Sequence, residues 1–171
     1  MSAEWLVEPL AAAHDRTAFN CGEPALGEYL SRYARQNQDA GVARTFVAVV
    51  PTEPASVLGF YSLTVGAIER SNLPPAAAKR FPRFPLPVAR LARLAVDRTA
   101  QGRGLGDYLL MDALSRCCEV ADRVGLVAVL IEAKHERAGR FYRRYEFESL
   151  PDQRLTMWLP VAAVRGLFVR K

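Results

Sequence analysis

The chain has 171 residues, half of them apolar and about a quarter charged, a composition that predicts one globular domain with its own core. The formal net charge is +5, no apolar run approaches the roughly eighteen residues of a membrane helix, and Met1–Trp5 lacks the basic flank and apolar core of a secretory signal. Three cysteines and two histidines without a C-x-x-C pair exclude a disulfide framework and give no zinc site, so we expect no metal and a cytosolic protein.

Apolar periodicity predicts alternating strands and helices along the chain. The expected strands are 6–9, 45–50, 57–65, 88–96, 126–132, 147–150 and 155–160. The expected helices are 23–38, 104–124 and 136–145, with a last short helix or strand at 161–169. Residues 71–87 hold five of the eleven prolines and predict an irregular surface loop. This order predicts an α+β fold, a single domain over 1–171 with helices on both faces of a central mixed sheet.

A glycine-rich segment, Gln101-Gly102-Arg103-Gly104-Leu105-Gly106, stands where a predicted strand gives way to a predicted helix. Such a junction offers unpaired backbone N–H groups and the positive end of a helix dipole, which together favour phosphate binding. Glycine at 104 and 106 lets the backbone approach a pyrophosphate without a Cβ clash. The segment therefore predicts a phosphate-binding loop, although glycines that serve only the packing of a helix start remain an alternative.

Two common phosphate loops do not fit this segment. The dinucleotide fingerprint needs a third glycine where Asp107 and Tyr108 stand, and the phosphate loop of nucleotide triphosphatases needs a lysine that is not there. The pattern Q-x-x-G-x-G fits instead. Downstream, after an apolar run at 126–132, the residues Ala138, Phe141, Tyr142 and Phe147 match the pattern A-x-x-F-Y-x-x-x-G-F, with Glu146 in place of its glycine.

The two motifs, in this order, resemble the GNAT superfamily of acetyltransferases. The resemblance extends to the GNAT toxins of bacterial toxin–antitoxin pairs, because Phe19-Asn20-Cys21-Gly22 followed by Leu26 and Tyr29-Leu30 is similar to the first motif of that family. Members acetylate the α-amino group of aminoacyl-tRNA and stop translation. The resemblance implies acetyl-CoA as co-substrate, aminoacyl-tRNA as substrate, and a ribbon-helix-helix antitoxin as partner.

The resemblance also implies roles for individual residues. Tyr142 is the candidate general acid for the coenzyme thiolate, since its phenol stays protonated at neutral pH. The implied coenzyme contacts are the strand residues Leu94, Ala95 and Val96, the loop residues Gln101, Gly102, Arg103, Gly104, Leu105 and Gly106, and His135 and Phe141. A structural hydrogen bond is the alternative for His135, which replaces the usual asparagine. No general base is evident; Glu132 closes a strand near the expected site, but carboxylates at strand ends are more often solvated or salt-bridged, so we do not assign it as the base.

Basic residues gather in two places. No acidic residue occurs between Arg70 and Val96, and 20 of the 23 basic residues of the chain are arginine. Arginine pairs with phosphates, and aromatic side chains stack on unpaired bases, so these segments predict contacts with an RNA end. The candidate RNA-binding residues are Lys79, Arg80, Arg83, Arg90, Arg93, Arg140 and Arg143. A solvated surface, or an arginine-rich genome, is the competing explanation, and a homodimer with a longer basic track is compatible with the sequence although no residue requires it.

Two other functions remain open from the sequence. A GNAT enzyme acting on a small-molecule amine or a protein N-terminus would turn over such amines without affecting translation. A non-catalytic binding module would not bind acetyl-CoA, and the presence of Gln101, Gly104, Gly106 and Tyr142 disfavours it.

Overall fold

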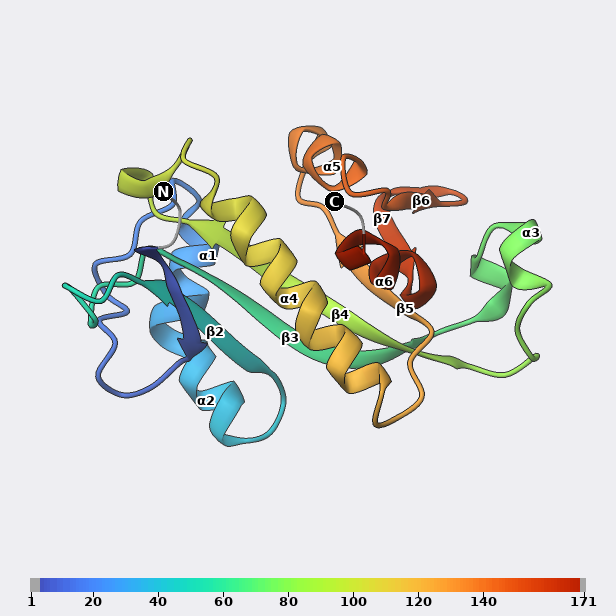
Figure 1. Ribbon diagram of the computed structural model, residues 1–171, viewed down its shortest axis with the longest axis horizontal. Coiled ribbons are helices and arrows are strands. Elements are labelled where there is room, and N and C mark those ends of the chain that lie inside the picture. Colours follow the sequence, from blue (N-terminus) through green and yellow to red (C-terminus); the bar gives the residue numbers. More distant parts are fainter. Residues whose placement is uncertain (1–3, 170–171) are drawn as a thin grey trace. The chain divides into compact units, whose positions relative to one another are not determined.

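The computed structural model describes residues 4–169. Met1–Ala3, which belong to the segment expected not to be a secretory signal, lie outside the described residues. The chain divides into two compact units (Figure 1). The first comprises Met1–Thr64 and Ala92–Ala113, and the second comprises Val65–Leu91 and Leu114–Lys171.

The described strands form a seven-stranded mixed sheet in the order β1-β2-β3-β4-β5-β7-β6. Their bounds are β1 Leu6–Pro9, β2 Arg44–Val49, β3 Gly59–Ile68, β4 Leu86–Val96, β5 Ala128–Glu132, β6 Glu148–Leu150 and β7 Gln153–Pro160. The pairing of β4 with β5 is parallel and joins Val88–Leu91 to Ala128–Ile131. The pairs β1–β2, β2–β3, β5–β7 and β6–β7 are antiparallel. The predicted α+β class with a mixed sheet is confirmed.

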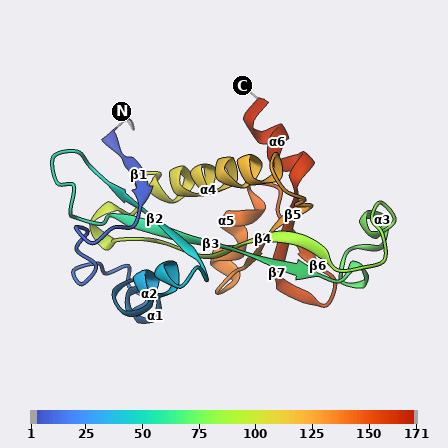
Figure 2. The same cartoon turned by 90° about the horizontal axis from the view of Figure 1, so that it is seen from below.

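Helices cover both faces of the sheet in the first unit. The helical segment after the N-terminal motif consists of α1 (Pro24–Glu28), η2 (Tyr29–Tyr33) and α2 (Ala34–Asp39), and α4 spans Leu105–Ala121. Figure 2 shows α1 and α2 on one side of β2 and β3, and the start of α4 on the other. Alternation along the strands explains both contacts, because successive side chains of a strand point to opposite faces.

The two faces have different packing partners. Val47, Val49 and Phe60 belong to the buried cluster that contains Leu26, Tyr29, Leu30 and Ala34 of the helical segment. On the opposite face, Phe46 stacks on Tyr61, whose hydroxyl donates a 2.5 Å hydrogen bond to Asp112 of α4. Gly59 leaves room for α4, since a Cβ there would lie 2.8 Å from Leu109 Cδ1.

The second unit holds the remaining helices. These are α3 (Pro75–Ala78), α5 (Glu136–Arg143) and α6 (Val161–Val169). A short 3-10 turn at Arg70–Asn72 also belongs to this unit, and another at Arg98–Ala100 belongs to the first unit. The apolar cluster of the second unit gathers Leu86 and Val88 of β4, Leu130 of β5 and Trp158 of β7 around Leu73. The helix option predicted for 161–169 is therefore the one that the structure adopts.

Three sequence predictions need correction. The helix expected over 23–38 is interrupted, because Tyr29–Tyr33 adopts π-helical geometry, a local widening that periodicity does not reveal. The segment 71–87, expected to be irregular, contains α3, which begins at Pro75 because proline suits the first turn of a helix. Helix α4 ends at Ala121 rather than at 124, and Val124 is exposed. No helix among the described residues is long and apolar enough to cross a membrane.

Candidate functional site

The glycine loop of the first unit contains two residues in a left-handed backbone conformation. Gly102 has φ +80° and Gly104 has φ +87°, a left-handed conformation that side-chain-bearing residues rarely adopt. A Cβ at either position would meet no atom within 4 Å, so open space borders the backbone at both glycines. Helix α4 begins at Leu105, which places the unpaired N–H groups of its first turn beside this open backbone. The loop can therefore receive an anion such as a pyrophosphate.

Gln101 uses its side chain within the protein. Its carboxamide Nε2 donates to the carbonyl oxygen of Val96 at 2.9 Å and to that of Cys21 at 3.1 Å. Both N–H groups of this amide have a protein acceptor, so the side chain has no donor left for a coenzyme. The Val96 carbonyl is likewise engaged. Of the other predicted strand residues, Ala95 is buried and Leu94 is half-buried.

Asp97 is a residue of this region that we did not single out from the sequence. Its carboxylate accepts hydrogen bonds from the backbone N–H groups of Asn20 at 2.8 Å and Thr99 at 3.0 Å, and from the Thr99 hydroxyl. Partial burial opposes ionisation of Asp97, but these hydrogen bonds and the neighbouring Arg98 outweigh it and lower the pKa. The Asp-x-Thr spacing, which is typical of a capped turn, is the signal that would have identified it.

In the second unit, Tyr142 is held by the short helix α5. Its side chain is 8% exposed and packs edge-on against Phe141 and Phe147, with ring centroids 5.1 and 5.8 Å away. Burial raises the pKa of the phenol to about 12, so Tyr142 is protonated throughout the neutral range. Among the described residues, none forms a hydrogen bond with its hydroxyl, which leaves this proton available for donation.

Helix α5 is fixed at its N-terminus by two side chains. The Nδ1 atom of His135 accepts a hydrogen bond from the backbone N–H of Ala138 at 3.2 Å and caps the helix. His135 thus makes the structural hydrogen bond that we weighed against a coenzyme contact. Glu136, next in the chain, is bound by Arg154 at 2.8 Å and by Arg143 at 3.0 Å.

We expect the Glu136 cluster to make stability fall in acid. Hydrogen bonds from Arg154 and then Arg143 lower the pKa of Glu136 from 4.5 to about 2. Because the folded state has the lower pKa, the stabilisation is complete above about pH 4.5 and disappears as the pH falls toward 2. Melting temperatures of the parent and of Glu136→Gln, measured from pH 7 to pH 2, should therefore differ at neutral pH and converge at the acid end. A difference that does not change with pH would contradict this assignment.

Comparison with known proteins identifies the family. Residues 41–149 match the family model described as an acetyltransferase (GNAT) domain. The chain belongs to the GNAT acetyltransferases. The resemblance drawn from the glycine loop and the Phe-Tyr motif is thereby confirmed, and both motifs lie within the matched segment.

Relatives of this GNAT chain match it along nearly its whole length. The "tRNA-acetylating toxin" of Mycobacterium tuberculosis is 40% identical over 158 residues, which cover 92% of this chain and 93% of the relative. The "probable toxin TacT" of Sinorhizobium fredii is 31% identical over 175 residues, with 97% and 96% covered.

Solved structures of related toxins also match this chain along nearly its whole length. AtaT complexed with acetyl-methionyl-tRNAfMet has a TM-score of 0.90 at 29% identity and covers 97% of this chain and 100% of its own. AtaTR bound with acetyl-CoA has a TM-score of 0.86 at 29% identity, with 98% and 99% covered. An AtaT mutant toxin bound to the C-terminus of the antitoxin AtaR and acetyl-CoA has a TM-score of 0.85 at 26% identity, with 98% and 99% covered.

The basic residues of this GNAT chain fall into different environments. In the second unit, Lys79, Arg80 and Arg83 lie exposed between α3 and β4, and no ion pair engages them within the described range. Arg140 is exposed on α5 and Arg90 is half-buried on β4. The charge of Arg143, in contrast, is offset by Glu136.

Arg93, in the first unit, is held by an aromatic ring that the sequence did not connect to it. Its guanidinium carbon lies 3.8 Å from the ring centroid of Tyr29, close enough for a cation–π interaction. Tyr29 in turn stacks on Phe60 at 6.5 Å. None of the described residues forms a hydrogen bond or ion pair with Arg93, so its donors are held in place and remain available.

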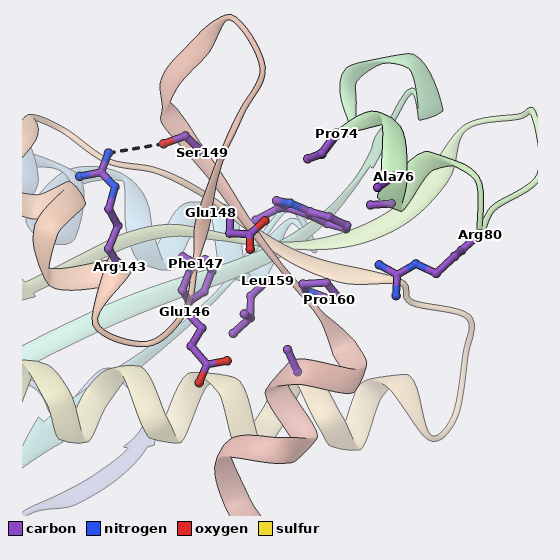
Figure 3. A pocket seen from close by; sticks show the side chains of 13 residues that line it. Pro74, Ala76, Arg80, Arg143, Glu146, Phe147, Glu148, Ser149, Leu159 and Pro160 are labelled. Carbon is purple, nitrogen blue, oxygen red and sulfur yellow. Dashed lines mark hydrogen bonds between the residues drawn. The ribbon is translucent and has the colours of Figure 1, made fainter.

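Two cavities of the second unit contain basic residues. One of about 980 Å³ has Arg80 and Arg143 on its wall, together with Glu146, Phe147 and Glu148 (Figure 3). In Figure 3, the guanidinium of Arg143 reaches toward Ser149, to which it donates a 3.4 Å hydrogen bond. A smaller cavity of about 430 Å³ is lined by Glu69, Arg70, Ser71, Pro75, Ala78, Lys79 and Arg83. Neither cavity is lined by Tyr142.

Glu146 occupies the glycine position of the Phe-Tyr motif and retains a left-handed backbone, with φ +74°. A glutamate in this conformation carries strain of about 1 kcal/mol or more, whereas glycine carries none. We expect Glu146→Gly to raise the free energy of unfolding by about 0.5–1 kcal/mol, measured by urea denaturation. Asp152→Gly is the matched control, because Asp152 has φ +65° but aspartate tolerates this region better, and its gain should be smaller. A loss of stability in Glu146→Gly would contradict the assignment of strain.

Proposed function

We propose that this chain transfers the acetyl group of acetyl-CoA to the α-amino group of aminoacyl-tRNA, and that it is the toxin of a toxin–antitoxin pair. The observation that carries the proposal is its 40% identity, along nearly its whole length, to a relative named for acetylating tRNA. The AtaT structures, with acetyl-methionyl-tRNAfMet in one and with acetyl-CoA and an antitoxin C-terminus in another, support the same substrates and partner class. We further propose that both units act as one catalytic domain in the cytosol.

The glycine loop is the proposed site of the coenzyme pyrophosphate. The open backbone at Gly102 and Gly104 and the N–H groups that begin α4 suit a group of that size and charge. Leu94–Val96 of β4 lies beyond the part of the strand that pairs with β5, so we propose its backbone as a contact for the pantetheine arm. Acetyl-CoA would supply the activated thioester. We propose no metal, and the described residues contain no cluster of three or more His, Cys, Asp or Glu that could hold one.

Tyr142 is the proposed general acid. The neutral α-amine attacks the acetyl carbonyl carbon, the C–N bond forms, and the C–S bond of the thioester breaks with its electrons on sulfur. Tyr142 donates its phenolic proton to that sulfur and regains a proton from the solvent or from the attacking nitrogen. We assign no residue as the base, because an α-amine has a pKa near about 8 and is partly neutral at physiological pH.

Arg93 and the exposed basic residues after α3 are the proposed RNA contacts. The cation–π contact with Tyr29 restrains the Arg93 guanidinium, so that it can pair with a phosphate or carbonyl with a smaller loss of side-chain freedom. Lys79, Arg80 and Arg83 add positive charge, and none of the three forms an ion pair within the described residues. We further propose a ribbon-helix-helix antitoxin as partner.

A cell-free translation extract tests the proposal as a whole. Purified protein should stop peptide synthesis only when acetyl-CoA is present, and fresh aminoacyl-tRNA should restore synthesis once the protein is removed. Translation that continues, together with acetylation of a small amine or a protein N-terminus, would replace the tRNA substrate by that alternative.

A further inference from the structure

Three hydrogen bonds join the N-terminal motif to the segment before the glycine loop, and a fourth lies within that segment. The backbone N–H of Asn20 donates to Asp97 Oδ1 at 2.8 Å, and the N–H of Arg98 donates to the Asn20 carbonyl at 2.9 Å. The carboxamide of Gln101 then joins the Cys21 carbonyl to the Val96 carbonyl. We call this set of contacts, between Asn20–Gly22 and Val96–Gln101, the clasp. It lies wholly within the first unit.

The clasp ends directly at the glycine loop. Gln101 is its last residue, and at Gly102 and Gly104, which follow, an added Cβ would meet no atom within 4 Å. Glycine loses more conformational freedom on ordering than any other residue, so a loop of this kind needs an anchor if it is to be ordered before its ligand arrives. Gln101 supplies that anchor at the N-terminal end of the loop, whereas the C-terminal end continues into α4.

The shape of the N-terminal half of the clasp depends on Gly22. This residue has φ +95°, and its N–H donates to Asn20 Oδ1 at 3.0 Å, which closes a turn over Asn20–Gly22. The turn presents the Asn20 and Cys21 carbonyls to Arg98 and Gln101. A Cβ at Gly22 would make only ordinary contacts, at 3.7 Å or more, so any residue other than glycine is disfavoured there by the backbone and not by crowding.

We propose that Gln101 is a positioning residue for coenzyme binding and that Asn20–Gly22 is the fixed point to which it holds the glycine loop. The inference rests on the proposed function, since it takes this loop as the pyrophosphate site. It assigns the Gln101 side chain to the protein and not to the coenzyme, and it gives the N-terminal motif a role in a site about 80 residues away along the chain. Loss of the clasp leaves the loop disordered until the coenzyme binds, so that the ordering cost weakens binding.

The test measures the dissociation constant of coenzyme A by calorimetry for the parent and four variants. Gln101→Glu replaces the donor by a carboxylate that faces two carbonyl oxygens, and Gly22→Ala strains the turn without touching the loop. We expect both to weaken coenzyme A binding by roughly tenfold, because Gln101→Glu removes two hydrogen bonds from the pre-ordered state and Gly22→Ala strains the turn that presents one of their acceptors. In turnover measured over a range of acetyl-CoA concentrations, KM for acetyl-CoA should rise while kcat changes little.

Each of the two test variants has a control variant with the same type of substitution at another position. Gly41→Ala imposes the same backbone strain at φ +78°, beyond the end of α2, and Gln36→Glu makes the same chemical change on an exposed helix position. Both should bind coenzyme A as the parent does. If Gly22→Ala and Gln101→Glu also bind as tightly as the parent, or if kcat falls with KM unchanged, the positioning role is wrong. If the parent itself does not bind coenzyme A, the proposed function fails first and the inference fails with it.

Discussion

Replacing Tyr142 by phenylalanine is expected to lower kcat for acetyl transfer by about 10²–10⁴-fold, the usual contribution of a general acid, while coenzyme A binding is unchanged. The substitution keeps the ring and its edge-on contacts with Phe141 and Phe147, and it removes only the hydroxyl. That hydroxyl has no hydrogen-bond partner among the described residues, so its loss leaves no buried group unsatisfied. The measurement is the single-turnover rate of acetyl transfer under saturating acetyl-CoA, beside a calorimetric dissociation constant.

Tyr145→Phe is the matched control for this prediction. Tyr145 lies three residues further along, and its ring contacts Phe141 at 5.8 Å, so the variant removes a hydroxyl from the same neighbourhood. Its turnover should remain close to that of the parent. Because the pKa of Tyr142 is raised to about 12, the parent should also show no loss of rate from phenol ionisation as the pH rises from 7 to 9. Equal activity of Tyr142→Phe and the parent would remove Tyr142 from the mechanism.

The second large effect is expected from the exposed basic residues after α3. Changing Lys79, Arg80 and Arg83 together to glutamine should weaken tRNA binding at low salt and reduce the slope of log affinity against log salt by about 2–3. Each phosphate contact releases close to one counterion when the RNA binds. Between 50 and 200 mM salt, the parent should therefore lose about 16- to 64-fold more tRNA affinity than the triple variant loses. Filter binding of tRNA across that salt range gives the slope directly.

Arginines that already have a carboxylate partner are the control. Arg32 pairs with Glu28 at 3.2 Å, and Arg165 pairs with Asp122 at 2.9 Å, so each charge is offset before RNA arrives. Arg32→Gln and Arg165→Gln should leave the salt slope unchanged. A triple variant with the slope of the parent would show that the arginine and lysine excess after α3 is a solvated surface, the alternative that composition left open.

The sequence predicted those parts of the fold whose signal is periodic. β1 has the bounds expected for it, and β4, β5 and α5 begin or end within two residues of the prediction, because alternation and helical spacing reflect burial in one stable element. The π-helical turn at Tyr29–Tyr33 and the short helix α3 were missed. Both depend on local backbone choices that the spacing of apolar residues does not encode.

The candidate site likewise has features that the sequence predicted and features that it did not. The sequence predicted that glycine at 104 and 106 would let a ligand approach the backbone, and the left-handed glycines of the structure are those at 102 and 104. The stacking of Arg93 on Tyr29 and the joining of Asn20–Gly22 to Asp97 and Gln101 were not predictable, since each connects residues more than sixty positions apart. Glu146 is an intermediate case: the motif marked the position as glycine, and the backbone kept the glycine conformation although the side chain changed.

The central claim is that the acetyl group arrives on the α-amino group of aminoacyl-tRNA. The most direct measurement incubates the protein with acetyl-CoA labelled in its acetyl group and with charged tRNA, followed by mild alkaline hydrolysis of the aminoacyl ester and mass spectrometry. We predict that the label leaves the RNA as an N-acetylated amino acid, and that uncharged tRNA receives none. Label that stays on the RNA after hydrolysis, or that appears only on small amines or protein N-termini, would contradict the claim.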